Sequence, residues 1–407
     1  MRITVAIACL LFISAAHAQP GVETGWNSVK SGKHRIQVSS NFGFQSASLR
    51  RDFLWTAFTG DVLDKATINR QYSDLQAYNN RLGVDGLQQV QVDLALTRNL
   101  WIVIGVTDEF HVDATFSNSL FQLIFMGNSG FNGDTAFMPN ERMQALRYQQ
   151  MFAGVTGNMG VATTYTLAVA YLNGEQWVEV EAMAETWLSP DADSIYAAIK
   201  GRVNYSDTSS MGFMAPNGYG LALNFGLAHW FSTQKGRITL SATVRNLGMM
   251  QWGPYSRSIE MDTGIIFTGI ELSDIGSFTS SLSVPDSMLA LLPPERLGVE
   301  NRLMPGWAHF SAAYLGPKWS FNASLICAWR AGFKPMLTVE PGLRIGRALH
   351  VTTELGYGGY AYGQLGAGLE LNRDRFAVKI KARQLQTFLL DSSPAGFGIH
   401  FNLNIWI

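Results

Sequence analysis

The stretch FGIHFNLNIWI, residues 397–407, ends the chain and decides the fold. Every second residue from Phe397 to Ile407 is apolar, and the positions between them carry Gly398, His400, Asn402 and Asn404. Because neighbouring residues of a strand point to opposite faces, this segment has one apolar and one polar face. Its length matches a tilted strand that crosses a bilayer in about 9–11 residues. The apolar face packs on a core in a soluble sandwich, but meets lipid in a transmembrane barrel whose lumen is polar.

The first eighteen residues have the pattern of a secretory signal peptide. Arg2 precedes an apolar run at residues 3–13, and the small residues Ala16 and Ala18 flank His17. We predict cleavage after Ala18, which leaves residues 19–407 as a single outer-membrane β-barrel domain. Cys327 is then the only cysteine, so the mature chain has no internal disulfide.

The composition favours a sheet embedded in a membrane. No apolar run of 18 or more residues follows the signal, so no helical span is expected. Hydrophobic residues make up 47% of the chain and charged residues 15%, against roughly 25% charged in ordinary soluble domains. The net charge of −1 argues against a nucleic-acid partner. We therefore expect an all-β protein in the outer membrane of a Gram-negative cell.

Alternating segments separated by turn residues predict an antiparallel up-and-down barrel of about fourteen strands. The predicted strands are residues 35–45, 88–96, 100–113, 144–156, 161–172, 219–231, 237–247, 307–315, 319–329, 335–345, 349–357, 362–371, 375–386 and 397–407.

Parity supports this count, because barrels of this kind have short periplasmic turns and long external loops. Six short turns, beginning at Thr97, Gly157, Thr233, Gly316, Gly346 and Asn372, all fall on one side. Four inserts, residues 46–86, 115–142, 173–217 and 248–305, fall on the other. Helices are predicted at residues 52–70 and 286–292, and strand-like runs at 177–187 and 195–205 are expected to extend a hairpin beyond the membrane.

Trp319 and Trp329 are predicted to mark the two edges of the lipid-facing band. They share one face of a strand and lie ten residues apart. At about 3.3 Å per residue and a tilt near 40°, they are separated by roughly 25 Å along the membrane normal. The alternative is a sandwich strand with two core tryptophans.

The inward face of the last strands is predicted to be ionic. Lys379, Lys381 and Arg383 alternate with apolar residues, and inward positions of neighbouring strands carry Glu340, Arg344, Glu354 and Glu370. Opposite charges confined in a lumen satisfy one another. One interpretation is a lattice that ties strands together, and the other is a polar pathway or an anionic-ligand site near Lys379 and Arg383.

No enzyme chemistry is predicted. His229, His309, His350 and His400 are scattered over separate strands without metal-ligand spacing. No Ser–His–acid set can be placed from the sequence, and no nucleotide-binding loop occurs. Arg245 to Gly248 is interpreted as the end of a strand. We expect no catalytic residues, no metal and no cofactor.

Several short stretches resemble an uncharacterised outer-membrane barrel family of the Bacteroidota, a domain of unknown function. They are LFQLIFMGN at 120–128 with FNG at 131–133, YGLALNFG at 219–226, VRNLG at 244–248 with Trp252, and FTGIEL at 267–272. The family is similar to the superfamily of the long-chain fatty-acid transporter (FadL) and PorV. This resemblance implies a fourteen-stranded barrel. Fatty-acid transporters have an N-terminal hatch, whereas only residues 19–34 precede the first strand here, so the 46–86 insert is the alternative plug.

Three functions follow from these expectations. The first is passive transport of small hydrophobic compounds, with a FadL-like or PorV-like role. The second is a partner-binding scaffold in secretion or surface-protein assembly, and the third a barrel lipid hydrolase. The expected partners are outer-membrane lipid, the barrel-assembly machinery through residues 397–407, and a hydrophobic ligand or a secretion-system protein.

Overall fold

The computed structural model describes residues 32–131, 133–189, 195–207, 212–267, 296–346, 348–390 and 394–407. The predicted signal peptide and the helix predicted at 286–292 lie outside these residues. Fourteen strands form the barrel: β1 (Arg35–Arg50), β2 (Asn80–Ala95), β3 (Leu100–Phe116), β4 (Thr135–Met159), β5 (Thr163–Leu188), β7 (Gly218–Thr233), β8 (Gly236–Phe267), β10 (Trp307–Leu315), β11 (Trp319–Ala328), β12 (Lys334–Ile345), β13 (Leu349–Gly359), β14 (Gly363–Asn372), β15 (Phe376–Arg383) and β16 (Pro394–Trp406).

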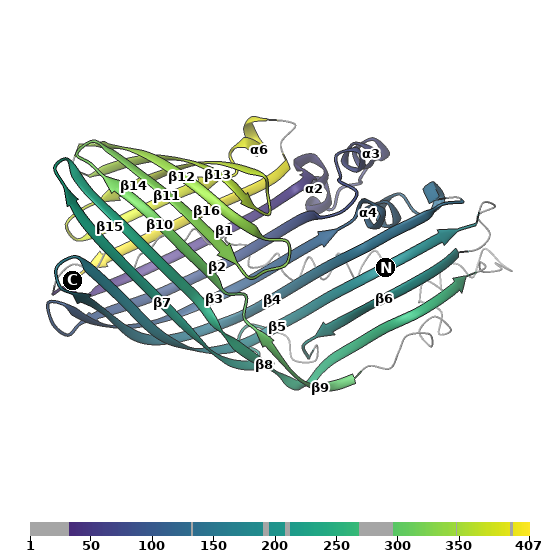
Figure 1. The fold of residues 1–407 in the computed structure, drawn as a ribbon, viewed down its shortest axis with the longest axis horizontal. Coiled ribbons are helices and arrows are strands. Elements are labelled where there is room, and N and C mark those ends of the chain that lie inside the picture. Colours follow the sequence, from purple (N-terminus) through teal and green to yellow (C-terminus); the bar gives the residue numbers. More distant parts are fainter. Residues whose placement is uncertain are drawn as a thin grey trace.

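Antiparallel pairing closes these strands into one ring, in which chain neighbours are also spatial neighbours (Figure 1). The C-terminal strand β16 pairs with β1, with Trp406 opposite Arg35. Strand β10 pairs with β8, with Trp307 opposite Arg245. The prediction of a fourteen-stranded up-and-down barrel is therefore confirmed. We call the end with the short turns the turn end, and the opposite one the loop end.

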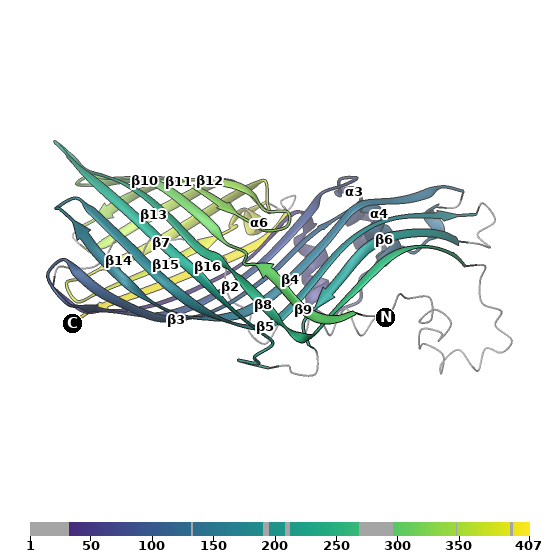
Figure 2. The same cartoon turned by 60° about the horizontal axis from the view of Figure 1, so that its bottom comes forward.

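An arm extends beyond the barrel at the loop end (Figure 2). The outer parts of β4, β5 and β8 form it together with β6 (Ile195–Tyr205), and β9 (Arg296–Leu303) pairs with β8 at its base. The predicted hairpin extension is present, with Trp187 opposite Tyr196. The prediction that the strand of residues 237–247 ends there is wrong, because β8 runs on to Phe267. The inserts are shorter than predicted for the same reason.

The two faces of the barrel wall differ as the alternation predicts. Apolar side chains such as Leu221, Leu247 and Leu355 are 63%, 58% and 57% exposed on the outer face. The intervening positions are buried and mostly polar, for example Asn41, Gln91 and Asn402. An apolar belt around a polar interior is the surface that an outer-membrane barrel turns to hydrocarbon. No helix among the described residues is long and apolar enough to span a membrane.

Short helices cover the outer wall at the loop end. They are α2 (Arg51–Thr59), α3 (Lys65–Ser73), α4 (Asn118–Phe125) and α6 (Gln386–Leu389). Phe53 of α2 and Phe121 of α4 pack against the barrel wall. The wall residues that they contact, Phe44, Leu82 and Phe116, are at outward-facing positions of β1, β2 and β3. The single helix predicted at 52–70 is broken at Gly60, where φ is +74°. The 46–86 insert thus covers the outside of the wall and does not plug the lumen.

Candidate functional site

Arg330 bridges distant strands of the barrel at its loop end. It lies between β11 and β12 and reaches Asp85 on β2 and Asp113 on β3. Its Nη2 and Nε lie 2.6 and 3.2 Å from the Asp113 carboxylate. Strands β11 and β2 are seven steps apart in both directions around the ring of fourteen. This contact therefore spans the full width of the lumen.

Tyr360, between β13 and β14, reinforces this contact. Its hydroxyl donates to Asp113, and the Arg330 guanidinium lies 5.6 Å from its ring centroid. The ring lies against Gly83, where an added Cβ would be 2.1 Å from it. Glycine at position 83 is thus required by the close approach of the ring. We call Asp85, Asp113, Arg330 and Tyr360 the mouth latch.

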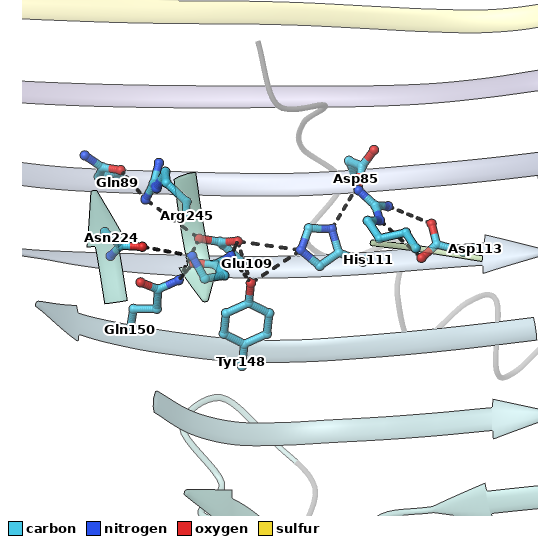
Figure 3. A network of polar contacts seen from close by, with 11 residues as sticks. Asp85, Gln89, Glu109, His111, Asp113, Tyr148, Gln150, Asn224 and Arg245 are labelled. Carbon is cyan, nitrogen blue, oxygen red and sulfur yellow. Dashed lines mark hydrogen bonds and ion pairs between the residues drawn. The ribbon is translucent and has the colours of Figure 1, made fainter. Parts of the chain in front are cut away.

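A chain of buried polar contacts continues from the mouth latch toward the centre of the lumen (Figure 3). The Nδ1 of His111 lies 2.8 Å from Asp85, and its Nε2 lies 3.6 Å from Glu109. The Tyr148 hydroxyl donates to Glu109 at 2.6 Å. We call the residues of this region the central network: Gln89, Glu109, His111, Tyr148, Gln150, Asn224, Arg245 and Asn246.

A bulge in β8 supplies two members of the central network. Its register against β7 shifts between Leu223 and Phe225, and Asn246 has a φ of +58°. Successive residues Arg245 and Asn246 therefore both point into the lumen. The Nη2 of Arg245 donates to Gln89 at 3.0 Å, and the amide of Asn246 donates to Tyr148 at 2.8 Å.

One side of the lumen carries apolar residues where a water-filled pore would carry polar ones. These residues point inward, since their neighbours Ile104, Met151, Val169, Leu221 and Met249 lie exposed on the outer face. Trp177 and Trp252 stack at 5.6 Å between centroids. We call this set the apolar wall: Val103, Phe152, Ala168, Ala170, Leu172, Trp177, Ala222, Met250 and Trp252.

The structure brings five of the seven charged residues predicted for the lumen into contact. Lys381 Nζ lies 2.6 Å from both Glu340 and Glu354. Arg383 Nε lies 3.0 Å from Glu354, and Lys379 Nζ lies 3.9 Å from Glu340. These pairs link β12, β13 and β15 from inside.

The other two, Arg344 and Glu370, lie toward the turn end, with Glu370 directly opposite Lys379 in the β14–β15 pair. Glu370 lies 3.7 Å from His350. Arg344 is exposed, and its guanidinium reaches the carbonyl of Gly316 at 3.5 Å. The tryptophans predicted for the girdle, Trp319 and Trp329, lie at the two ends of β11 and are 64% and 57% exposed.

The sequence pattern did not predict the contacts of the mouth latch or of the central network. Their signal was present in the inward carboxylates of β2 and β3, namely Asp85, Asp93, Glu109 and Asp113. Carboxylates on one stretch of lumen wall require cations from elsewhere. The sequence does not say which cations reach them.

Comparison with known proteins places the chain in a family. The model of a family of unknown function, DUF5723, matches residues 32–380. The chain belongs to this family. The resemblance to a barrel family of unknown function is thereby confirmed. No curated protein matches the sequence.

Solved barrels resemble this DUF5723 chain only in general architecture. They include the Pseudomonas putida toluene transporter TodX, with 7% identity, a TM-score of 0.44, and coverage of 96% of this chain and 94% of that one. A Pseudomonas aeruginosa FadL homologue has 9% identity, a TM-score of 0.42, and coverage of 92% and 90%. The translocator domain of autotransporter NalP from Neisseria meningitidis has 10% identity, a TM-score of 0.37, and coverage of 99% and 97%. Likeness at this level does not bear on what the chain does. Among the described residues, no cluster of His, Cys, Asp or Glu is suited to hold a metal ion.

Proposed function

We propose that this protein carries small hydrophobic compounds across the outer membrane, and that the structure is its closed state. The observation that carries the proposal is the apolar wall, which faces the lumen. Barrels that pass water and ions have polar interiors. In the closed state these side chains are buried against one another. Once opening exposes them, they give a hydrophobic solute a surface to move along, from which polar solutes gain nothing.

Contacts across the lumen support the closed state. Arg330 and Arg245 each reach strands on a distant part of the ring, and the groups that they contact are buried. A passage at this level requires the mouth latch to separate. Separating buried ions without new partners costs several kcal/mol, so the closed form dominates until a solute stabilises the open one.

Uptake into liposomes tests this proposal. Vesicles with the folded full-length barrel are expected to take up a labelled hydrophobic compound faster than empty vesicles. Leu172→Asn places an amide on the apolar wall and should slow uptake. Leu303→Asn is the matched control, since Leu303 is 82% exposed on β9. Uptake no faster than in empty vesicles would reject transport.

The arm supports a second candidate function, partner binding at the cell surface. Strands β4, β5, β6 and β8 continue past the barrel and form a sheet that transport through the lumen does not require (Figure 2). A protein that binds the arm should co-purify after mild detergent extraction and be lost when residues 195–205 are replaced by a short linker. A barrel that elutes alone after crosslinking in cells argues against this function.

A further inference from the structure

A cavity at the turn end of the barrel contains a serine, a histidine and a glutamate in contact. The cavity has a volume of about 360 Å³, and it is lined by Ser320, His350 and Glu370 together with many neutral polar side chains. Its lining includes Leu315, Asn372 and Trp406 from the turn end. It lies apart from the mouth latch and the central network, none of whose residues line it.

The three side chains have the relative placement of a nucleophile, a base and an orienting acid. Ser320 Oγ lies 2.7 Å from His350 Nε2. On the other side of the ring, His350 Nδ1 lies 3.7 Å from Glu370 Oε2. With the proton on Nδ1, toward Glu370, Nε2 accepts the serine hydroxyl hydrogen bond. A nucleophile bonded to a base that a third group orients is the arrangement shared by unrelated serine hydrolases.

Four neighbouring strands, β11 to β14, bring these residues together. His350 on β13 pairs directly with Glu370 on β14. Ser320 lies on β11, and β12 runs between it and His350. The contact crosses β12 over Gly342, where an added Cβ would lie 2.4 Å from Ser320 Oγ and 2.5 Å from His350 Nε2. Any side chain at position 342 would therefore separate serine from histidine.

The surroundings suit acyl transfer. The histidine and glutamate side chains are 20% and 27% exposed, so molecules in the cavity reach them. Thr352 lines the same cavity, and its buried hydroxyl has no partner among the described residues. Lys379 lines the cavity as well, but it lies 3.9 Å from Glu340 and directly opposite Glu370. The Thr352 hydroxyl is therefore the donor available to a developing oxyanion.

We propose that Ser320 is the nucleophile of a serine hydrolase site that acts on small polar carboxylic esters. Ser320 Oγ attacks the ester carbonyl, and its proton passes to His350 Nε2. The leaving alcohol takes that proton as the C–O bond breaks, which leaves an acyl group on Ser320. Water, deprotonated by His350, then releases the carboxylic acid and restores the serine. The size of the cavity favours a small ester over a lipid, and the hydroxyl and amide side chains in its lining can bind polar groups of that ester. Glu370 is a positioning residue that acts through His350.

Covalent labelling and turnover test the proposal on the folded full-length barrel in lauryldimethylamine oxide, a detergent without an ester bond. A fluorophosphonate probe should attach to Ser320, as located by peptide mass spectrometry. p-Nitrophenyl acetate should be hydrolysed, and Ser320→Ala should abolish both. His350→Ala should lower hydrolysis by about 10²–10⁴-fold. Gly342→Ala should lower it similarly, although it changes none of the three residues.

Ser324→Ala is the matched control. Ser324 lies on the same strand and faces the lumen, but it bonds Thr338 at 2.7 Å and does not line the cavity. Its substitution should change neither labelling nor turnover. Migration of unheated samples in gels reports that each variant is folded.

The positioning role of Glu370 has its own readout. Glu370→Gln should lower kcat and leave KM nearly unchanged, since Glu370 orients His350 and does not touch the substrate. Glu370→Asp should restore part of kcat. A probe that does not attach to Ser320 in the wild-type protein, or hydrolysis that persists in a folded Ser320→Ala variant, overturns the proposal. Uptake of hydrophobic compounds should be equal in wild type and Ser320→Ala, so failure of this site is distinguishable from failure of transport.

Discussion

Replacing Arg330 with glutamine tests whether the mouth latch holds the barrel closed. The substitution removes the cation from two carboxylates, Asp85 and Asp113, whose side chains are 3% and 1% exposed. Breaking a buried ion pair by removing one partner costs about 3–5 kcal/mol. Arg296→Gln is the matched control, because Arg296 pairs with Glu260 at 3.7 Å with side chains 78% and 49% exposed. An exposed pair contributes about 0–1 kcal/mol.

Urea unfolding of the barrel in lipid vesicles, followed by tryptophan fluorescence, measures the difference. Arg330→Gln should lower the midpoint strongly, and Arg296→Gln should leave it nearly unchanged. Combining Arg330→Gln with Asp85→Asn and Asp113→Asn should recover most of the loss, because no buried carboxylate then lacks a cation. Equal losses in the two arginine variants would refute the assignment of a latch. So would a combined variant that remains as unstable as Arg330→Gln.

Three further substitutions test separate parts of the structure. Gly83→Ala should displace the Tyr360 ring, which would lie 2.1 Å from the new Cβ, and should lower the free energy of unfolding by about 1–3 kcal/mol in urea titrations. Asn246→Ala should destabilise more than Asn246→Gly in the same assay, because both lose the amide contacts but only glycine adopts a φ of +58° without strain. On the arm, burial raises the pKa of Glu141, while hydrogen bonds from Ser117 oppose the shift. Its contribution to stability is therefore full below the unfolded-state value of about 4.3 and is lost as the pH rises through the higher folded-state value. Glu141→Gln, which keeps an acceptor oxygen, should remove this pH dependence of the unfolding midpoint; an unchanged dependence would contradict the assignment.

The barrel strands could be predicted because the pattern that encodes them is local. In β16, lipid on one side and the lumen on the other impose a two-residue period on every membrane-crossing position. The same holds for β11, where Trp319 and Trp329 fall on one face. No long-range information is needed to recognise such a segment. The six short turns were enough to show that the number of strands is even and that the long inserts share one side.

The continuation of β8 into the arm could not be predicted in the same way. Gly248 was interpreted as a strand end, but a Cβ there would lie 2.1 Å from the carbonyl oxygen of Leu221. The glycine permits close approach of two strands and does not end one. Beyond the membrane, neither face of the strand is held against lipid or against the lumen. The alternation of apolar and polar residues therefore weakens. The bulge at Asn246 also shifts the alternation by one residue.

The lumen contacts depend on positions around the ring, which a linear pattern does not contain. Arg330 and Asp113 are 217 residues apart in sequence, and Tyr360 and Asp113 are 247 apart. They meet because fourteen strands place β11 opposite β2 and β3. The Ser320–His350 contact also depends on the arrangement of neighbouring strands, because it requires a glycine on the strand between them. Lumen chemistry therefore becomes visible only once strand order and register are known.

The positions of the mouth latch and of Ser320 lead to a last prediction. The latch closes the loop end, whereas the serine lies in a cavity lined by residues of the turn end. Short turns face the periplasm in barrels of this kind, so a probe should reach Ser320 from the periplasm only. A charged fluorophosphonate linked to a polymer too large for porins should leave Ser320 unlabelled in intact cells and label it once the outer membrane is permeabilised. Arg330→Gln should not change this result, since a passage opened beside the apolar wall does not admit a bulky charged polymer. Labelling in intact cells expressing the wild-type protein would mean that the loop end is open, which contradicts the closed barrel, or that the turn end faces outward, which contradicts the orientation taken from the short turns.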